Sequence, residues 1–409
     1  MVLSNIFTMT WTILLVCIFL ILTDSKKIIP IYLIASMWIN FDVRCGSVSL
    51  ISALSAFIII LGLITKRKTL LFKTDLDHIV GIYFTYAIFI YVPFILLSTD
   101  LNVFSQLNYI KSQILSVILL IIIWKWKSYN IYMWKKQGAF INISITILCL
   151  YGIYTYLSQS NPYMDIMGQY CTNKNLSDLL AISIEDARGN LHGRITGTSL
   201  YTIQYGILLV ILFYMQALMR SLYKLKIIML IISILIFMNL YLTGSRGPLG
   251  ALIIGFAFYL MRTFNWKKRV LYVSILSIFI FLVWPYLESY FSLFTNDIGG
   301  SSFEMRAAQF GGAFSMVSDN LQSLLFGKGL GYTSFYLTNY GKHPLALNFE
   351  STHVSGIVNY GIMGLIFIFL CNIMFLFFIT KKAYNKNLIG NNCYYLLVSF
   401  LLTYFIYNL

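Results

Sequence analysis

Long runs of apolar residues alternate with short polar segments along the whole chain. Most runs hold roughly 17 to 25 residues, the length that a helix needs to cross about 30 Å of hydrocarbon. We therefore predict an all-α, polytopic integral membrane protein with about twelve transmembrane helices. The first run has no basic residue before it and no small-residue cleavage site, so we interpret it as a retained span rather than a signal peptide. The predicted spans are 7–23, 28–41, 48–65, 78–98, 107–126, 138–158, 199–217, 226–243, 246–263, 270–288, 354–379 and 392–408.

Charged residues are few and unevenly placed. Only 11% of the residues are charged, against about 25% in a typical soluble domain. Most Lys and Arg fall in short segments on one side of the predicted spans, such as "KRKTLLFK" and "NWKKR", and this marks that face as cytoplasmic. The net charge of +15 therefore indicates membrane topology rather than nucleic-acid binding.

The opposite, external face carries two long loops, about 159–198 and 289–353, whereas the predicted cytoplasmic connections are short. Loops of more than about 15 residues are usually functional or disordered. These two mix Tyr, Phe, Asp, Arg and His without low complexity, so we expect them to fold. The sequence thus predicts one membrane domain, residues 1–409, whose two external loops form the active-site face.

A polar break, Gly244-Ser245-Arg246-Gly247, separates two spans at the external surface. Its glycines permit the backbone angles of a tight turn, and Pro248 suits the first turn of a helix. We expect Arg246 to project from the start of that helix at the level of the lipid headgroups. Because a charge costs about 2.5 kcal/mol or more at the centre of a membrane helix, a functional role is one interpretation. The other is an arginine that only anchors the hairpin at the interface.

Two further arginines stand next to or inside the external loops. Arg194 precedes the span 199–217, and Arg306 lies within the second loop. Arginine binds phosphate groups through a planar, permanently charged fork. Arg194, Arg246 and Arg306 together would suit a lipid-linked pyrophosphate at the membrane surface, whereas each alone is also consistent with a solvated loop charge.

Glu350 and His353 stand three residues apart at the entry to the span 354–379. If that turn is helical, the two side chains share one face. Either could take a proton from a sugar hydroxyl. The alternative interpretation is a helix start, in which Ser351 or Thr352 is the cap and Glu350 is a favourable partner of the helix dipole.

Other chemistry is sparse. The four histidines form no metal-binding spacing and no GxSxG is present, so we predict neither a metal nor another cofactor. Acidic residues are nearly absent from the middle of the spans, which disfavours an ion-coupled transporter. Cys45 and Cys171 both fall on the external side and could pair. External tyrosines that could stack on sugars or belong to an interfacial belt include Tyr163, Tyr170, Tyr332, Tyr336 and Tyr340.

Four short motifs lie within residues 190–365. They are "RITG" from Arg194, "TGSRG" from Thr243, "FGKGLG" from Phe326 and "ESTHVSGIVNYGIMG" from Glu350. With the many spans and the two large external loops, this pattern resembles the superfamily of bacterial O-antigen polymerases (Wzy type) and O-antigen ligases. The first 150 residues resemble that superfamily only in their hydropathy.

The resemblance implies an all-helical, GT-C-type glycosyltransferase of the bacterial inner membrane, with a metal-independent active site that faces the periplasm. It implies that Arg194, Arg246 and Arg306 contact the pyrophosphate of an undecaprenyl-pyrophosphate-linked donor, and that His353 lies at the acceptor. The expected partners are the lipid-linked oligosaccharide donor and acceptor, membrane lipid and a chain-length regulator, but no nucleic acid.

Within the superfamily we expect a polymerase, which moves the growing glycan onto a new lipid-linked repeat unit with inversion at the anomeric carbon. An O-antigen ligase, which transfers the glycan to lipid A core, is the first alternative. A lipid-linked polysaccharide flippase is an alternative of another class. A flippase would place charged residues along a path through the spans, whereas this sequence gathers its charge at one surface.

Overall fold

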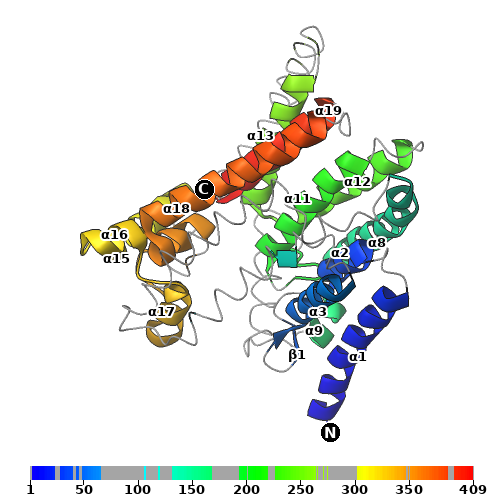
Figure 1. Ribbon diagram of the computed structural model, residues 1–409, viewed down its shortest axis with the longest axis horizontal. Helices are drawn as coiled ribbons and strands as arrows, with labels where there is room; N and C mark the ends of the chain where they lie inside the picture. The colour runs from blue at the N-terminus through cyan, green and yellow to red at the C-terminus, as the bar shows by residue number, and fades with distance from the viewer. Residues whose placement is uncertain are drawn as a thin grey trace. The chain divides into compact units, whose positions relative to one another are not determined.

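The computed structural model is built almost entirely of helices over the residues that it describes (Figure 1). Strands are limited there to a two-residue antiparallel pair, β1 (Arg44–Cys45) and β2 (Val48–Ser49), in which Arg44 faces Ser49. The described residues are 2–23, 28–39, 43–45, 48–65, 106, 118–119, 131–167, 193–199, 201–219, 226–263, 265, 270, 274, 302–346, 349, 351–385 and 391–408.

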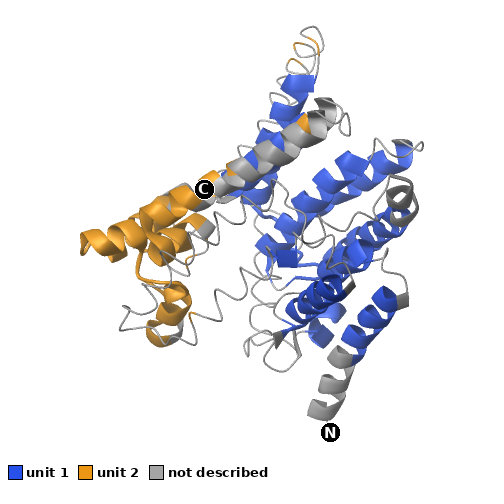
Figure 2. Cartoon of the chain, viewed as in Figure 1, with its two compact units in different colours: residues 1–71, 118–263, 395–407 blue, residues 72–117, 264–394, 408–409 orange. Residues whose placement is uncertain are grey.

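The chain divides into two compact units, each of which is described by itself (Figure 2). Unit 1 comprises residues 1–71, 118–263 and 395–407, and unit 2 comprises residues 72–117, 264–394 and 408–409. The described helices of unit 1 are α1 (Val2–Thr23), α2 (Ile28–Trp38), α3 (Leu50–Thr65), α8 (Ile131–Ser158), α9 (Pro162–Met167), α11 (Thr202–Met219), α12 (Lys226–Leu242), α13 (Arg246–Thr263) and most of α19 (Asn391–Asn408). The described helices of unit 2 are α15 (Ser302–Val317), α16 (Leu321–Phe326), α17 (Tyr332–Tyr340) and α18 (Thr352–Asn385).

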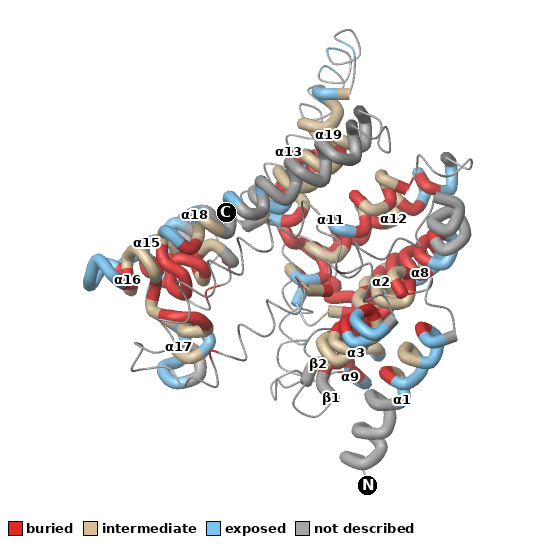
Figure 3. The backbone as a smooth tube through the Cα atoms, in the orientation of Figure 1, coloured by how far each residue is buried: buried red, intermediate tan, exposed pale blue. Residues whose placement is uncertain are grey.

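The core of unit 1 lies where α11 packs against α12 and α13, and where α8 packs against α2 and α12. Helix α11 contributes Tyr205, Leu209 and Leu212, which are buried and share one face because they are spaced by four and three residues. Buried segments recur along α8, α11 and α12, where these helices pack together (Figure 3).

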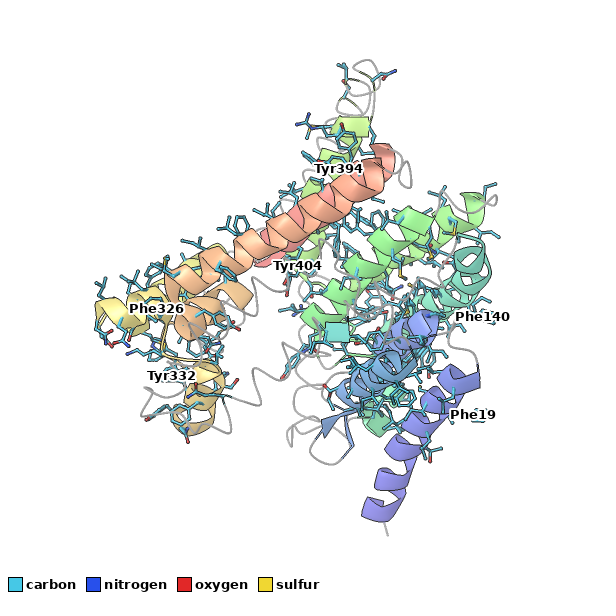
Figure 4. The ribbon with its side chains drawn as sticks, in the orientation of Figure 1. Phe19, Phe140, Phe326, Tyr332, Tyr394 and Tyr404 are labelled. Carbon is cyan, nitrogen blue, oxygen red and sulfur yellow. The ribbon has the colours of Figure 1, made fainter. Side chains whose placement is uncertain are left out.

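The outer faces of these helices are also apolar. Helix α8 buries Ile145 and Leu148 but exposes Phe140 (62%) and Ile147 (51%). Phe140, like Phe19 of α1, is labelled in Figure 4. A helix of a soluble protein normally carries polar residues on its exposed face, whereas a membrane span is apolar all round. The exposed apolar faces are thus consistent with a location in a membrane.

Two helices in the described part of the chain are long and apolar enough to cross a membrane, at 138–158 and 202–219. Shorter apolar helices of 10 to 17 residues occur in α1, α2, α3, α12, α13, α18 and α19. The bounds of α12, α13 and α19 lie within one residue of the predicted segments 226–243, 246–263 and 392–408. The structure therefore confirms that these three predicted segments are helical. The predicted spans 78–98, 107–126 and 270–288 lie almost wholly outside the described residues.

Unit 2 is built on α18, against which α15, α16 and α17 pack. Its core contains Ala313 and Val317 of α15 and Val354, Ile357 and Val358 of α18. Buried segments gather where these helices meet (Figure 3). Helices α15, α16 and α17 all fall within the predicted external loop 289–353, which is folded as expected over the part that is described.

Candidate functional site

The polar break between α12 and α13 is a compact, hydrogen-bonded turn. Helix α12 ends at Leu242, and α13 begins at Arg246. Gly244 adopts a positive φ of 59°, a conformation that glycine tolerates and most other residues do not. The Thr243 hydroxyl accepts a hydrogen bond from the Ser245 N–H at 3.1 Å. Both Thr243 and Ser245 are buried, so the turn is an ordered part of the fold rather than an exposed loop.

Arg194 lies directly on this turn although it is far away in sequence. Its Nε donates to the carbonyl of Thr243 at 2.9 Å, and its Nη2 donates to the Ser245 hydroxyl at 3.2 Å. A Cβ on Gly244 would lie 3.0 Å from the Arg194 Nε, so a larger residue here would crowd the guanidinium. The planar fork of arginine suits such a two-point contact. The RITG and TGSRG motifs therefore form one structure.

The segment that carries Arg194 is fixed by polar contacts on both sides. The N–H of Ile195 donates to the carbonyl of Leu242 at 3.3 Å, which ties the segment to the end of α12. The buried Asn161 amide donates from Nδ2 to the Thr196 hydroxyl and to the carbonyl of Gly197, both at 2.9 Å. The backbone around Arg194 is thus positioned by α12 and by the residues between α8 and α9.

Two further contacts hold the ends of this segment. The N–H of Gly193 donates to Oε1 of Gln159 at 2.9 Å, and the Thr198 hydroxyl donates to the carbonyl of Met37 at 2.7 Å. The sequence alone did not single out Asn161 or Gln159. The only available signal was a pair of amide side chains immediately after a long apolar run, which is also common in ordinary loops.

Arg246 is the first residue of α13, as the sequence predicted for its backbone, and its side chain lies outside the described residues. The start of α13 approaches α11 closely at Gly206. A Cβ on Gly206 would lie 3.0 Å from Cγ of Pro248 and 3.5 Å from Cβ of Ser245. The glycine therefore sets how near α11 lies to the turn that precedes Arg246.

The FGKGLG motif of unit 2 packs backbone against backbone on α18. Helix α18 is interrupted at Gly361, which has φ 68° and ψ −175°, and Gly327 has φ 84° and ψ −177°. These angles are open almost only to glycine. A Cβ on Gly327 would lie 2.6 Å from the backbone of Asn359 and Tyr360, and a Cβ on Gly361 would overlap the backbone of Leu325. The two glycines therefore have a packing role, and the motif is not a phosphate-binding loop of the dinucleotide type.

Asn359 completes this backbone contact. Its Oδ1 accepts from the Thr333 N–H and its Nδ2 donates to the Thr333 hydroxyl, both at 3.1 Å, while the side chain is 1% exposed. The N–H of Lys328 also donates to the carbonyl of Val358 at 2.8 Å. The break in α18 is therefore held by backbone hydrogen bonds and by the neutral amide of Asn359.

His353 lies in the first turn of α18, and its imidazole is half-buried. The His353 N–H donates to the hydroxyl of Ser351, the residue before the helix, at 3.2 Å. Ser351 thus acts at the helix start as the alternative interpretation expected. Glu350 lies outside the described residues, and Arg306 is described only by its backbone, within α15.

A histidine that the sequence did not single out has better-defined surroundings. Nδ1 of His343 accepts from the N–H groups of Leu345 at 3.2 Å and Ala346 at 2.9 Å. Its ring lies 5.6 Å from the ring of Tyr336 and 6.1 Å from that of Phe349. Partial burial lowers the pKa of His343, so the neutral form is favoured.

The described residues give no support for a metal site or a disulfide. No three His, Cys, Asp or Glu side chains gather there closely enough to share a metal ion. Cys171 lies outside the described part of the chain, as does the side chain of Cys45, so their pairing stays a prediction.

Over the described ranges, the protein is almost entirely helical and its helices have apolar outer faces. It therefore belongs to a class that is consistent with a membrane location. Residues 231–369 match the family model described as O-antigen ligase. This match confirms the resemblance seen in the motifs and supports the O-antigen polymerase and ligase superfamily. It includes Arg246, Arg306, Glu350 and His353, while Arg194 precedes it. No curated protein and no solved structure gives a match.

Proposed function

We propose that this protein is an O-antigen polymerase, an inverting glycosyltransferase that moves a growing glycan from undecaprenyl pyrophosphate onto a new lipid-linked repeat unit. The observation that carries the proposal is the contact between Arg194 and the turn before Arg246. Two arginines from distant motifs share one turn, and arginine is suited to pyrophosphate. The family match adds support, since its members are enzymes of glycosyltransferase or ligase type.

In the proposed reaction, an acceptor sugar hydroxyl attacks the anomeric carbon of the donor. A new carbon–oxygen bond forms as the bond to the pyrophosphate oxygen breaks, and undecaprenyl pyrophosphate leaves with the electron pair. Arg246, Arg194 and Arg306 would stabilise the negative charge that develops on the leaving group. Glu350 or His353 would take the proton from the attacking hydroxyl. Attack opposite the leaving group inverts the anomeric configuration.

Arg194 has two roles in this proposal. Its bonds to Thr243 and Ser245 fix the turn from which α13 starts, and its permanent charge adds positive potential beside that turn. Three permanent charges would make a divalent ion unnecessary for leaving-group stabilisation, so we propose a metal-independent enzyme. We also propose the twelve-span, GT-C-type architecture of one membrane domain over residues 1–409, in the bacterial inner membrane with the active site at the periplasmic face.

Two alternatives use the same residues differently. A ligase would transfer the glycan to lipid A core by the same chemistry, and the family match does not distinguish the two acceptors. A flippase would move the lipid-linked glycan without changing its length. In the described part of unit 1, Arg194 contacts a helix break rather than the middle of a helix, which favours an enzyme over a flippase.

The experiment that tests the proposal uses purified protein and a defined undecaprenyl-pyrophosphate oligosaccharide in EDTA, without lipid A. We expect a ladder of longer glycans, abolished by Arg246→Ala and by His353→Ala. Arg262→Ala is the matched control, because Arg262 lies on the same helix in its last turn and contacts Phe258 instead. Transfer only after addition of lipid A core would identify a ligase. No transfer under either condition would overturn both the polymerase and the ligase hypothesis.

A further inference from the structure

Helix α17 carries a row of tyrosines on one face. Tyr332, Tyr336 and Tyr340 are spaced by four residues, so they follow one another along the helix. The Tyr332 and Tyr336 ring centroids lie 6.4 Å apart, and those of Tyr336 and Tyr340 lie 5.2 Å apart. Figure 4 labels Tyr332, where the row begins. Tyr332 and Tyr336 pack against the core of unit 2, so the row is rigidly anchored at that end.

The other end of the row is open to solvent. Tyr340 is 68% exposed, although its ring contacts the rings of Tyr336 and Phe335. A large aromatic side chain that is both ordered by its neighbours and exposed differs from a loop residue that moves freely. Such a ring presents a flat, pre-positioned surface at low conformational cost.

His343 lies beside this surface and has a fixed tautomer. Because Nδ1 accepts two backbone N–H groups, the proton of the neutral ring must be on Nε2. Nε2 is therefore a hydrogen-bond donor, next to an aromatic ring of the same row, Tyr336. Lys342 is exposed and adds a second donor immediately before His343.

A flat aromatic surface combined with a fixed donor matches the chemistry of a sugar. Pyranose rings offer a face of C–H groups that packs on aromatic rings, and their hydroxyls accept hydrogen bonds from groups at the rim. A lipid surface would use the apolar part of the row but has no need of a histidine whose tautomer is locked. The polar rim therefore favours a carbohydrate over an acyl chain.

We propose that Tyr336, Tyr340 and His343 form a carbohydrate subsite in the second external loop. A sugar ring of the glycan stacks on Tyr340, and one of its hydroxyls accepts a hydrogen bond from Nε2 of His343. The subsite rests on the proposed function, because it binds the glycan that the enzyme would transfer. It acts in binding and takes no part in bond formation.

The test measures binding of a lipid-free ligand to the full-length protein in nanodiscs. The probe is an oligosaccharide of one repeat unit, released from the surface polysaccharide of the source strain and followed by saturation-transfer NMR titration. We expect Tyr340→Ala to raise the Kd about fivefold and Tyr340→Phe to stay within about twofold, because the phenylalanine keeps the ring. His343→Asn keeps an acceptor for the two backbone N–H groups but loses the Nε2 donor, and should raise the Kd about threefold.

Leu321→Ala is the control, since Leu321 is a 71% exposed apolar residue of α16 outside the row. It should leave the Kd unchanged. The unfolding midpoint of each variant is measured alongside, and the exposed changes at Tyr340 and Leu321 should not move it. A wild-type Kd for Tyr340→Ala, an equal loss with Leu321→Ala, or no binding by the wild-type protein would each overturn the subsite.

A parallel transfer assay with the lipid-linked donor separates this inference from the proposed function. If the wild-type protein extends glycans while Tyr340→Ala keeps its Kd and KM, the subsite fails and the enzyme remains. If the oligosaccharide binds in a Tyr340-dependent manner but no transfer occurs to either acceptor, the subsite stands and the enzyme assignment fails.

Discussion

Two helix breaks in the described part of the chain are built in opposite ways. The break between α12 and α13 in unit 1 is held by polar and charged side chains, with Arg194 bonded to Thr243 and Ser245. The break within α18 in unit 2 is held by close backbone contact at Gly327 and Gly361, with the neutral Asn359 as its side-chain partner. Both contain glycines with positive φ, so glycine content alone does not distinguish them.

The difference shows which glycine-rich motif is suited to bind an anion. A permanent guanidinium beside a turn provides charge for a ligand as well as structure. At Gly327 and Gly361 the two backbones lie too close even for an added methyl group, so no ligand can enter between those segments. We therefore interpret TGSRG as a functional motif and FGKGLG as a structural one, and the following predictions test that contrast.

The largest effect is expected from Gly361→Ala. Its φ and ψ are open almost only to glycine, and the added Cβ would overlap the backbone of Leu325. Strain and overpacking together should lower the free energy of unfolding by about 4 kcal/mol. Unfolding in mixed detergent micelles measures the change.

Two matched controls separate strain from overlap. Gly341→Ala has a similar backbone conformation but nothing within 4 Å of the added Cβ, so it should be destabilised by about 1 to 3 kcal/mol. Gly311→Ala lies inside α15 with open space around it, and should be neutral or slightly stabilising. Wild-type stability in Gly361→Ala would contradict the structural role of this break.

The next effect is expected from Arg194→Ala, and it concerns activity. Loss of the guanidinium removes a charge and both bonds to the turn, so kcat should fall about 100-fold in the glycan-ladder assay. Arg194→Lys retains the charge but not the two-point fork, and should recover part of that loss. If Arg194→Lys equals wild type, the fork geometry has no role. If Gly361→Ala remains folded but lowers kcat more than Arg194→Ala does, the break in α18 would be the functional one and our interpretation of the two motifs would be wrong.

A smaller effect is expected from Ser245→Ala. The substitution removes the hydroxyl that accepts from Nη2 of Arg194 and leaves the bond to Thr243 in place. One such hydrogen bond contributes about 1 kcal/mol, so kcat should fall about fivefold. Ser233→Ala is the comparison, because that hydroxyl only donates to the carbonyl of Met229 within α12. Equal losses in the two variants would show a general packing effect.

The smallest effect concerns pH and should appear only in unit 2. The pKa of His343 is lowered in the folded protein from an ordinary value of 6.5, so the unfolded chain binds the proton more readily. The stabilisation is complete above pH 6.5 and is lost as the pH falls from 6.5 towards the lower folded-state pKa. Unfolding midpoints measured from pH 7.5 to pH 5 should therefore decrease.

His343→Asn supplies the control for this pH dependence. Its side-chain oxygen can accept from the N–H groups of Leu345 and Ala346 without titrating, so the decrease below pH 6.5 should become smaller. The turn held by Arg194 contributes no such dependence, because a guanidinium stays charged throughout this range. An unchanged slope in His343→Asn would assign the pH dependence to other groups.

Much of the local structure was predictable from the sequence. The apolar runs predicted α12 and α13 nearly to the residue, and the polar break correctly predicted that α13 starts at Arg246. The predicted helix start near His353 is confirmed, with Ser351 bonded to its N–H. These features depend on neighbouring residues, so a pattern along the chain is enough to find them.

Contacts between distant segments were not predictable in the same way. Nothing local to Arg194 indicates that its Nε bonds to Thr243, or that Asn161 holds the backbone beside it. The interruption of α18 at Gly361 was missed because a single glycine in an apolar run is usually tolerated in a helix. The close packing on Gly327 was likewise invisible in the motif itself.

The sequence by itself determined the helical, apolar class of this protein, the position of its polar breaks and its resemblance to the O-antigen polymerase and ligase superfamily. Periodicity and composition are properties of consecutive residues, and helices follow from them directly. Only the tertiary structure decided that Arg194 belongs to the TGSRG turn and that FGKGLG serves as a backbone contact with α18. Those outcomes depend on which surfaces meet when the helices pack, and that is set by shape and hydrogen bonding across segments far apart in the chain.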